Sequence, residues 1–213
     1  MLTLTGSVYF NKETDSFERV QEETGQTTSD GIPIVRSIPI NLSSNERYGA
    51  EIGVMYNPAR WLRLNGSFNY YKFKNEGDFN GVSYDAENES YFARLSSKVT
   101  LPWSIQWQTN AFHRGASENS QTKTEPITSV SMALSKDILN DNATISLNVS
   151  DLFNTRKRES RTFTENFNSF SEFQWRERQI TATFVYRFNQ NKQMARQQNR
   201  DQGDGDAGGE GQF

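Results

Sequence analysis

The sequence predicts an all-β protein, namely an antiparallel, up-and-down transmembrane β-barrel segment of about eight long strands with a disordered C-terminal tail. Two observations favour this fold class. Apolar and polar residues alternate in repeated stretches along most of the 213-residue chain, and the connections between these stretches are short and long in turn. Strict alternation puts apolar side chains on one face of a strand and polar side chains on the other, which suits a wall between lipid and water.

The expected strands follow from this alternation and from the turn residues that bound it. In chain order they span residues 1–24, 32–56, 60–74, 85–100, 103–115, 121–137, 142–164 and 171–188. Several exceed the roughly 9–11 residues that cross a bilayer, so their outer ends should project beyond it as hairpins. Pro33, Pro39 and Pro126 fall in these outer ends, where a missing ladder hydrogen bond costs least.

The first four strands show the alternation in different lengths. In the first, Leu2, Leu4 and Val8 alternate with threonine and serine. The charged stretch 12–15 interrupts this run, and we interpret it as a β-bulge because a turn there would break the sequence of short and long connections. The next three strands carry their apolar residues at Tyr48, Ala50, Ile52, Val54 and Tyr56, at Leu62, Leu64, Phe68 and Tyr70, and at Tyr91, Ala93, Leu95 and Val99.

The last four strands repeat the pattern, and the eighth shows it most clearly. The fifth to seventh have apolar residues at Ile105, Trp107 and Ala111, at Val130, Met132 and Leu134, and at Ala143, Ile145, Leu147 and Val149. In the eighth, one face carries Ile180, Ala182, Phe184, Tyr186 and Phe188. Gln179, Thr181, Thr183 and Arg187 lie on the other face, where Val185 is the one apolar residue.

The connections give independent support. Residues 57–60, 101–103 and 139–142 form short links with proline, asparagine or aspartate, which favour tight turns. The links around residues 24–31, 75–85, 115–125 and 164–171 are longer and polar. Outer-membrane barrels have short periplasmic turns and long extracellular loops, so the short links are predicted to face the periplasm.

Composition restricts the function further. Mean hydropathy is −0.81, yet 13% of the residues are aromatic, a combination that a barrel reconciles because only every second residue has to be apolar. No apolar run approaches the roughly 20 residues of a membrane helix. The chain has no cysteine, which excludes disulfides and thiol chemistry, and its net charge of −3 argues against nucleic acid as a partner.

No catalytic constellation is apparent. The single histidine, His113, has no Ser/Asp partner that spacing supports, and it is interpreted as a residue at an outer strand end. The glycines at 203–209 neither follow a strand nor precede a helix, so they do not form a phosphate-binding loop. We therefore expect a non-enzymatic protein without cofactor or metal.

The polar face is predicted to line the lumen. Its members on the clearest strands are Arg63, Asn65, Arg94, Lys98, Gln106, Gln108 and Asn148. A slip by one residue would turn Arg63, Arg94 or Lys98 toward lipid, at a cost of roughly 2–4 kcal/mol each near the midplane, so the register is well fixed. Alternation alone also fits a soluble ligand-binding barrel with its apolar face inward. Loop asymmetry, strand length and the aromatic ending favour lipid outside.

Three short motifs resemble the TonB-dependent receptors and related outer-membrane β-barrels of Gram-negative bacteria. Tyr48-Gly49-Ala50-Glu51 is similar to the recurrent Gly-x-Glu of a descending strand, and Val149-Ser150-Asp151-Leu152-Phe153-Asn154 to the Asn-Leu-Phe-Asp element of the penultimate strand. Tyr186-Arg187-Phe188 resembles the aromatic end of the last strand. The resemblance covers residues 1–188 and implies the C-terminal part of such a barrel. It also implies that Ile180, Ala182, Phe184, Tyr186 and Phe188 form the signal read by the barrel-assembly machinery.

The resemblance carries further expectations. The family's signal peptide, TonB box and plug have no counterpart before Leu2-Thr3-Leu4, so we expect a fragment, a split gene or a mis-called start. The expected function is then to contribute wall and extracellular loops to a receptor-like transporter. Expected partners are outer-membrane lipid and lipopolysaccharide, the barrel-assembly machinery, the rest of the barrel with its plug, and the TonB energy-coupling complex. The alternative is a self-contained eight-stranded barrel with an adhesion or structural role. Residues 189–213 are polar and are expected to be a disordered periplasmic tail.

Overall fold

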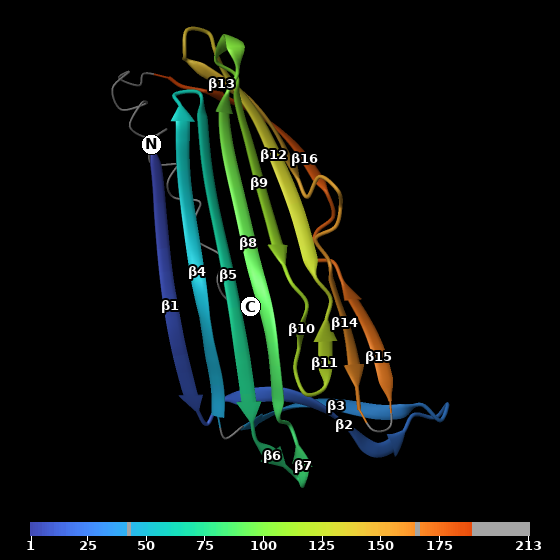
Figure 1. Ribbon diagram of the computed structural model, residues 1–213. Coiled ribbons are helices and arrows are strands. Elements are labelled where there is room, and N and C mark those ends of the chain that lie inside the picture. The colour runs from blue at the N-terminus through green and yellow to red at the C-terminus, as the bar shows by residue number, and fades with distance from the viewer. Residues whose placement is uncertain (42–43, 165–166, 189–213) are drawn as a thin grey trace.

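The computed structural model describes residues 1–41, 44–164 and 167–188, so the predicted tail lies outside the described residues. Eight antiparallel strands form one sheet in the order β1-β4-β5-β8-β9-β12-β13-β16 (Figure 1). Strands that follow each other in this order also follow each other along the chain, which confirms the all-β, up-and-down prediction. The bounds are β1 Leu2–Thr14, β4 Ser44–Ala59, β5 Leu62–Glu76, β8 Ala86–Thr100, β9 Gln106–Arg114, β12 Ile127–Ile138, β13 Ala143–Ser150 and β16 Gln179–Tyr186.

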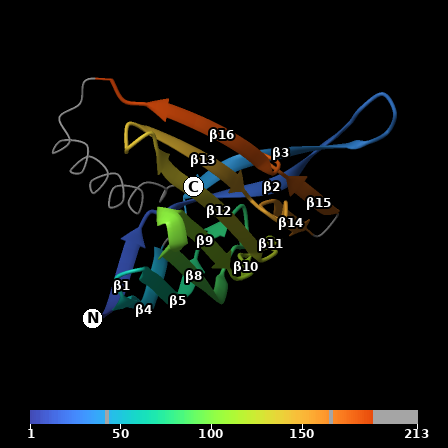
Figure 2. The same ribbon diagram turned by 90° about the horizontal axis from the view of Figure 1, so that it is seen from above.

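This main sheet is curved and open. Seen from above, its strands follow an arc from β1 to β16 (Figure 2). Within the described part of the chain, β1 pairs only with β4 and β16 only with β13. The outer edges of β1 and β16 therefore present unpaired backbone groups.

Smaller sheets extend one end of the main sheet. β2 (Phe17–Thr27) pairs with β3 (Pro33–Asn41), and β6 (Asp78–Phe79) pairs with β7 (Val82–Ser83). A four-stranded sheet has the order β10-β11-β14-β15, with bounds Ser117–Glu118, Thr122–Thr124, Arg158–Phe163 and Asn168–Phe173. All of these strands lie at the same end of the molecule, which we call the hairpin end (Figure 1). The long connections are therefore grouped at one end, as predicted.

The first predicted strand, 1–24, is wrong in one respect. It is divided into β1 and β2 by a corner at Asp15 and Ser16, where Asp15 has a φ of 56°. No residue is inserted at this corner, since Thr14 pairs with Ser44 and Phe17 with Asn41 in an unchanged register. The charged stretch is thus a bend in a continuous hairpin and not a β-bulge. Aspartate tolerates the left-handed conformation that the bend requires.

Four other predicted strands are also divided. The range 32–56 contains β3 and most of β4, which belong to different sheets. The ranges 121–137, 142–164 and 171–188 each contain two strands, one in the main sheet and one in the four-stranded sheet. Pro126 separates β11 from β12, because proline has no N–H to donate to a ladder. The turn at 151–154 separates β13 from β14, and residues 174–178 separate β15 from β16.

The short connections lie at the other end of the sheet, as expected. The first is shorter than predicted, because β4 continues to Ala59 with a register shift after Tyr56 and the turn is Arg60 and Trp61. The second is a 3₁₀ turn, Pro102–Ser104, in which Trp103 and Ser104 have positive φ. In the third, Leu139, Asn140 and Asp141 all have positive φ.

Gly49 of the Tyr48-Gly49-Ala50-Glu51 motif is required because its neighbours approach closely, and the backbone carbonyl oxygen of Tyr70 is the nearest atom to the position of an added Cβ. The Tyr9 hydroxyl crosses above it and donates a hydrogen bond to Asn69 Oδ1 at 3.1 Å. A Cβ atom at position 49 would lie 2.8 Å from the Tyr9 hydroxyl oxygen and 2.9 Å from Tyr71 Cβ. Only glycine leaves room for this crossing.

The apolar face of the main sheet is exposed. Val8 is 85% exposed, Ile145 49% and Phe184 60%. The buried hydrophobic residues in the described part of the chain are Val20, Ile40, Tyr84 and Ala143, and the first three lie at the hairpin end. The main sheet therefore has no globular core beneath it. This arrangement contradicts the soluble-barrel alternative, which needs the apolar face packed inside.

Candidate functional site

The seven polar residues predicted to face a lumen all lie on one face of the main sheet. Residues that pair directly in an antiparallel ladder share a face. Arg63 pairs with Lys98, Lys98 with Gln108, and Asn148 belongs to the same cross-strand row. Asn65, Arg94 and Gln106 lie an even number of residues from these positions along their own strands, which puts them on the same face. We call this face the polar wall.

Aromatic residues interrupt the polar wall in a way that alternation did not predict. Phe92 pairs with Arg114 across β8 and β9, and Arg94 pairs with Phe112 in the next row on the same face. The two phenylalanine rings stack with centroids 6.4 Å apart. The Arg94 guanidinium lies 4.6 Å from the Phe92 centroid, and Arg156 lies 5.8 Å from the Phe112 centroid. We call Phe92, Arg94, Phe112 and Arg114 the arginine–phenylalanine square.

The residues predicted as the assembly signal are placed only in part as expected. Ile180, Ala182, Phe184 and Tyr186 share the apolar face of β16, opposite Val149, Leu147, Ile145 and Ala143 of β13. β16 ends at Tyr186, so Phe188 lies beyond the strand, where its ring packs edge-on against Tyr186 at 4.6 Å. The prediction that the strand reaches Phe188 is therefore wrong.

The hairpin end is held together by the β2–β3 hairpin, which crosses from β1 toward β14 and β15 (Figure 2). Val20 and Ile40 of this hairpin pack with Tyr84, and Ile38 and Phe79 cover the cluster. Farther along, Gln21 and Gln121 form two hydrogen bonds between side-chain and backbone atoms, at 2.9 and 3.1 Å. The hairpin is thereby docked onto the loops that follow β5 and β9.

Glu18 is the polar centre of this docking. One carboxylate oxygen accepts a hydrogen bond from Asn75 Nδ2 at 3.0 Å, and the other accepts one from Asn119 Nδ2 at 2.5 Å. Burial raises the pKa of the Glu18 carboxyl above its usual value, while the two amide donors act in the opposite direction. A single carboxylate thus links β2, the end of β5 and the loop between β10 and β11.

A polar cavity of about 330 Å³ adjoins this carboxylate. It is open on one side and lies between the hairpin β2–β3, the hairpin β10–β11 and the hairpin β14–β15, where they meet the polar wall. Its lining residues are Glu18, Arg19, Phe73, Ser117, Glu118, Asn119, Thr122, Thr124 and Arg158. The mixture of carboxylates, guanidinium groups and hydroxyls suits a polar ligand rather than an apolar one.

Asp151 of the Val149–Asn154 motif organises the connection from β13 to β14. Its buried carboxylate accepts hydrogen bonds from Ser129 Oγ at 3.2 Å and from the Arg156 backbone N–H at 2.9 Å. Its own N–H donates to Ser131 Oγ at 3.1 Å. The motif is therefore a turn that ends the strand and brings Arg156 over Phe112.

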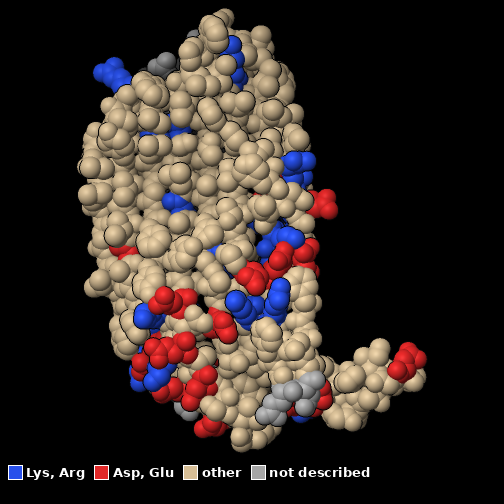
Figure 3. Space-filling model, turned by 45° about the vertical axis from the view of Figure 1, so that its right-hand side comes forward, with Lys and Arg blue, Asp and Glu red and all other residues tan. Residues whose placement is uncertain are grey.

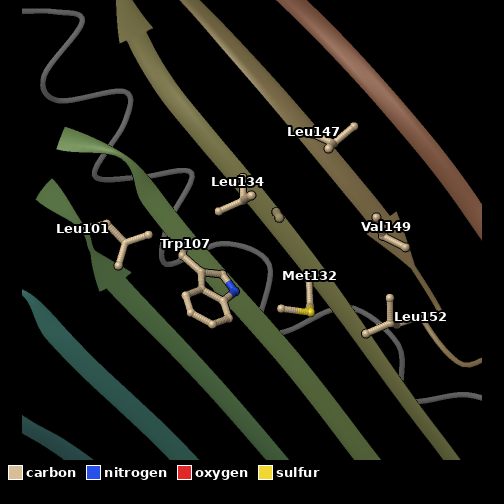
Figure 4. Close-up of a pocket in the computed structure, with 8 residues that line it drawn as sticks. Leu101, Trp107, Met132, Leu134, Leu147, Val149 and Leu152 are labelled. Carbon is tan, nitrogen blue, oxygen red and sulfur yellow. The ribbon is translucent and has the colours of Figure 1, made fainter. Parts of the chain in front are cut away.

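A groove of about 400 Å³ crosses the apolar face at the opposite side of the sheet (Figure 4). Trp107 comes from β9, Met132 and Leu134 from β12, and Leu147 and Val149 from β13. Leu101 and Leu152 lie at its ends. Its apolar lining fits a hydrocarbon chain and offers no specific polar contact.

Charged side chains gather at the hairpin end on the face shown in Figure 3, and the rest of that face is mostly uncharged. Lys157 forms ion pairs with Glu159 and Glu172, at 2.7 and 2.8 Å, and their hydrogen bonds raise the pKa of Lys157. The described ranges contain no group of three or more acidic or histidine residues placed to hold a metal ion. Nor does the part of the chain described here contain a helix long and apolar enough to span a membrane.

Mild acid should strengthen the docking of the β2–β3 hairpin. Because the folded pKa of Glu18 is raised, the docked state binds the proton more tightly, so docking gains stability as the pH falls through that pKa and loses it as the pH rises. Amide hydrogen exchange across β2 and β3, corrected for intrinsic rates, should be slower near pH 5 than near pH 7. Glu18→Gln should abolish the difference. The control Glu22→Gln, which removes the exposed pair with Arg36, should retain it. A pH effect that persists in Glu18→Gln would contradict the assignment.

Comparison with known proteins gives one finding. A family model described as the outer membrane protein beta-barrel family matches residues 1–186. No curated protein and no solved structure matches the chain.

Proposed function

The chain belongs to the outer membrane protein beta-barrel family, and from this premise we propose that it forms part of the wall of a larger, TonB-dependent receptor-like transporter in the outer membrane. In this proposal the polar wall faces the lumen and the apolar face meets lipid. The hairpin end supplies extracellular loops for substrate uptake, and the short turns face the periplasm. An outer-membrane location follows from the family itself, whereas the transport role is the proposal.

The open edges of the sheet are the observation that carries this proposal. Among the described residues, no strand pairs with the outer edge of β1, which is 13 residues long, or with that of β16, which is 8 residues long. Unpaired backbone groups in hydrocarbon cost several kcal/mol each, so membrane sheets close into barrels. Further strands from the rest of a larger barrel would pair with both edges. An eight-stranded barrel would instead have to bring β1 against β16 and fill its narrow interior with side chains.

Aromatic residues at both ends of the apolar face support the membrane placement. Tyr48, Tyr70 and Tyr91 lie toward the hairpin end, and Tyr56, Trp61 and Trp107 lie toward the short turns. Residues 48–56 have the length of one bilayer crossing, roughly 9–11 residues. Rings with a polar edge suit the headgroup level, so these residues would form two interfacial girdles.

The partners of the proposed transporter follow from its parts. Lipid and lipopolysaccharide would surround the apolar face, and the barrel-assembly machinery would read Ile180, Ala182, Phe184 and Tyr186, with Phe188, at the free edge of β16. The remaining strands and a plug would complete the pore, and a TonB complex would supply energy. The net charge of −3 argues against nucleic acid as a further partner.

Cysteine cross-linking tests the proposal, because the chain has no native cysteine. Pairs that combine Thr3, Thr5 or Ser7 of β1 with Thr181 or Thr183 of β16, each changed to cysteine, sample the registers that a closed barrel would use. We expect no intramolecular disulfide in the membrane-inserted chain. Thr5→Cys with Gly53→Cys is the positive control, because these positions pair in β1 and β4. A β1–β16 disulfide at any register would establish the self-contained eight-stranded barrel instead.

A further inference from the structure

We propose that the arginine–phenylalanine square binds an oxyanion, that is, a carboxylate, sulfate or phosphate group of a small solute. This inference rests on the proposed function in one respect, because it requires the polar wall to be open to solutes. It names a site and a ligand class that the fold alone does not imply.

Two positive charges lie close together on this part of the polar wall. Arg94 and Arg114 lie on neighbouring strands in adjacent rows of one face, and neither forms an ion pair with a carboxylate of the described ranges. Two carboxylates of the same wall lie near the square: Asp151, which accepts a hydrogen bond from Ser129 beside Phe112, and Glu51, which is separated from Phe92 by Asn69. Neither forms an ion pair with Arg94 or Arg114, so both guanidinium groups remain available to attract an anion from solution.

Two buried hydrogen-bonding groups near the square have no partner. Arg114 Nε is buried and has no hydrogen-bond partner in the structure. Ser90 lies one step along the same face of β8 from Phe92, is 3% exposed, and its Oγ also lacks a partner. A buried donor without an acceptor is destabilising, because it has lost its hydrogen bonds to water without replacement. Both groups lie on the face that carries Arg94, so an oxyanion bound beside the square offers an acceptor on the side where these donors lack one.

Neighbouring side chains restrict the position of Arg94. Its guanidinium carbon lies over the Phe92 ring, 4.6 Å from the centroid, and a planar guanidinium can bind a carboxylate or phosphate through two N–H groups at once. The Phe92–Phe112 stack fixes both rings, and the Asp151 turn holds Arg156 beside them. The square is thus built from side chains whose positions are set by their neighbours rather than from freely moving surface arginines.

The position of the square favours a solute over a protein segment as its ligand. Arg114 is the last residue of β9 before the loop of β10 and β11, so the square lies on the side of the hairpin end. Arg156 reaches it from the connection to β14. A solute that enters between the outer hairpins meets this part of the wall first, whereas a plug that enters from the periplasm meets Arg63 and Lys98.

The experiment uses the full chain, folded in detergent micelles, with citrate, pyrophosphate and neutral maltose as probes in isothermal titration calorimetry. We expect citrate or pyrophosphate to bind and maltose not to bind. Arg94→Gln and Arg114→Gln should each weaken anion binding about tenfold, as expected for loss of one charge-assisted hydrogen bond. The matched controls Arg63→Gln and Lys98→Gln remove the same charge from the same wall and should change the affinity less than about twofold.

Two results would overturn the proposal. Equal weakening by all four variants would mean general electrostatic attraction without a site, and no binding of either anion would mean that the square is structural. If the β1–β16 disulfide forms and no anion binds, both the proposed function and this inference are contradicted. If the disulfide does not form and no anion binds, only this inference is contradicted. Circular dichroism of each variant checks that it has folded.

Discussion

Leu147→Arg should lower the free energy of unfolding in a bilayer by about 2–4 kcal/mol, whereas Asn148→Arg should lower it by less than about 1 kcal/mol. Leu147 lies in the middle of β13, pairs with Leu134 and Ala182 on the apolar face, and is 43% exposed. Arginine there would have to leave water for hydrocarbon. Asn148 is the next residue and lies on the polar wall, so arginine at that position would remain in contact with water.

Urea titration of the protein refolded into lipid vesicles measures both values, with folding followed by heat-modifiable gel mobility. The two variants carry the same added charge at adjacent positions, so their difference reports only the face of the sheet. Equal costs would show that both faces meet the same environment. A larger cost for Asn148→Arg would place lipid against the polar wall and reverse the orientation.

Asp151→Ala should destabilise the protein by about 3 kcal/mol, because it leaves buried hydrogen-bond donors without an acceptor. The carboxylate is 4% exposed and accepts from Ser129 Oγ and from the Arg156 backbone N–H. Amide exchange should increase across residues 151–178, since the turn positions the whole connection from β13 to β16. Urea titration and hydrogen exchange measure the two effects.

The matched control for this variant is Asp141→Ala. Both aspartates have positive φ, 50° at Asp151 and 69° at Asp141, so alanine meets the same backbone strain at both positions. Asp141 is exposed in a short turn, so removing its carboxylate leaves no buried donor without an acceptor. Asp151→Asn keeps one acceptor and should be intermediate. If Asp151→Ala and Asp141→Ala cost the same, backbone strain and not the carboxylate network explains the loss.

The faces of the strands could be predicted from the sequence, but the breaks within them could not. Alternation with a period of two places Arg63, Lys98 and Asn148 on one face because the pleat leaves no other choice. A corner such as that at Asp15 keeps the same period and the same register on both sides, so alternation cannot reveal it. Only the charged stretch 12–15 indicates an irregularity there, and its interpretation as a bulge is wrong.

The candidate site depends on contacts that have no local signal in the sequence. Glu18 meets Asn75 and Asn119, which lie 57 and 101 residues away along the chain. The arginine–phenylalanine square was missed for a different reason. Phe92 and Phe112 are apolar residues at positions that alternation assigns to the polar face, and only the register of β8 and β9 shows that their rows are adjacent. Two aromatic residues out of phase on neighbouring strands are the signal that could have identified it.

The buried cluster of Val20, Ile40 and Tyr84 indicates that the hairpin end and the main sheet are stabilised in different solvents. At the hairpin end, water drives apolar side chains together, and protein atoms alone shield them. Along the main sheet, the apolar side chains lie beside their cross-strand neighbours but remain exposed, so the surrounding lipid or detergent shields them. Diluting the detergent should therefore loosen the sheet while the docked hairpins still hold, so that denaturation begins in the wall and reaches the outer loops last.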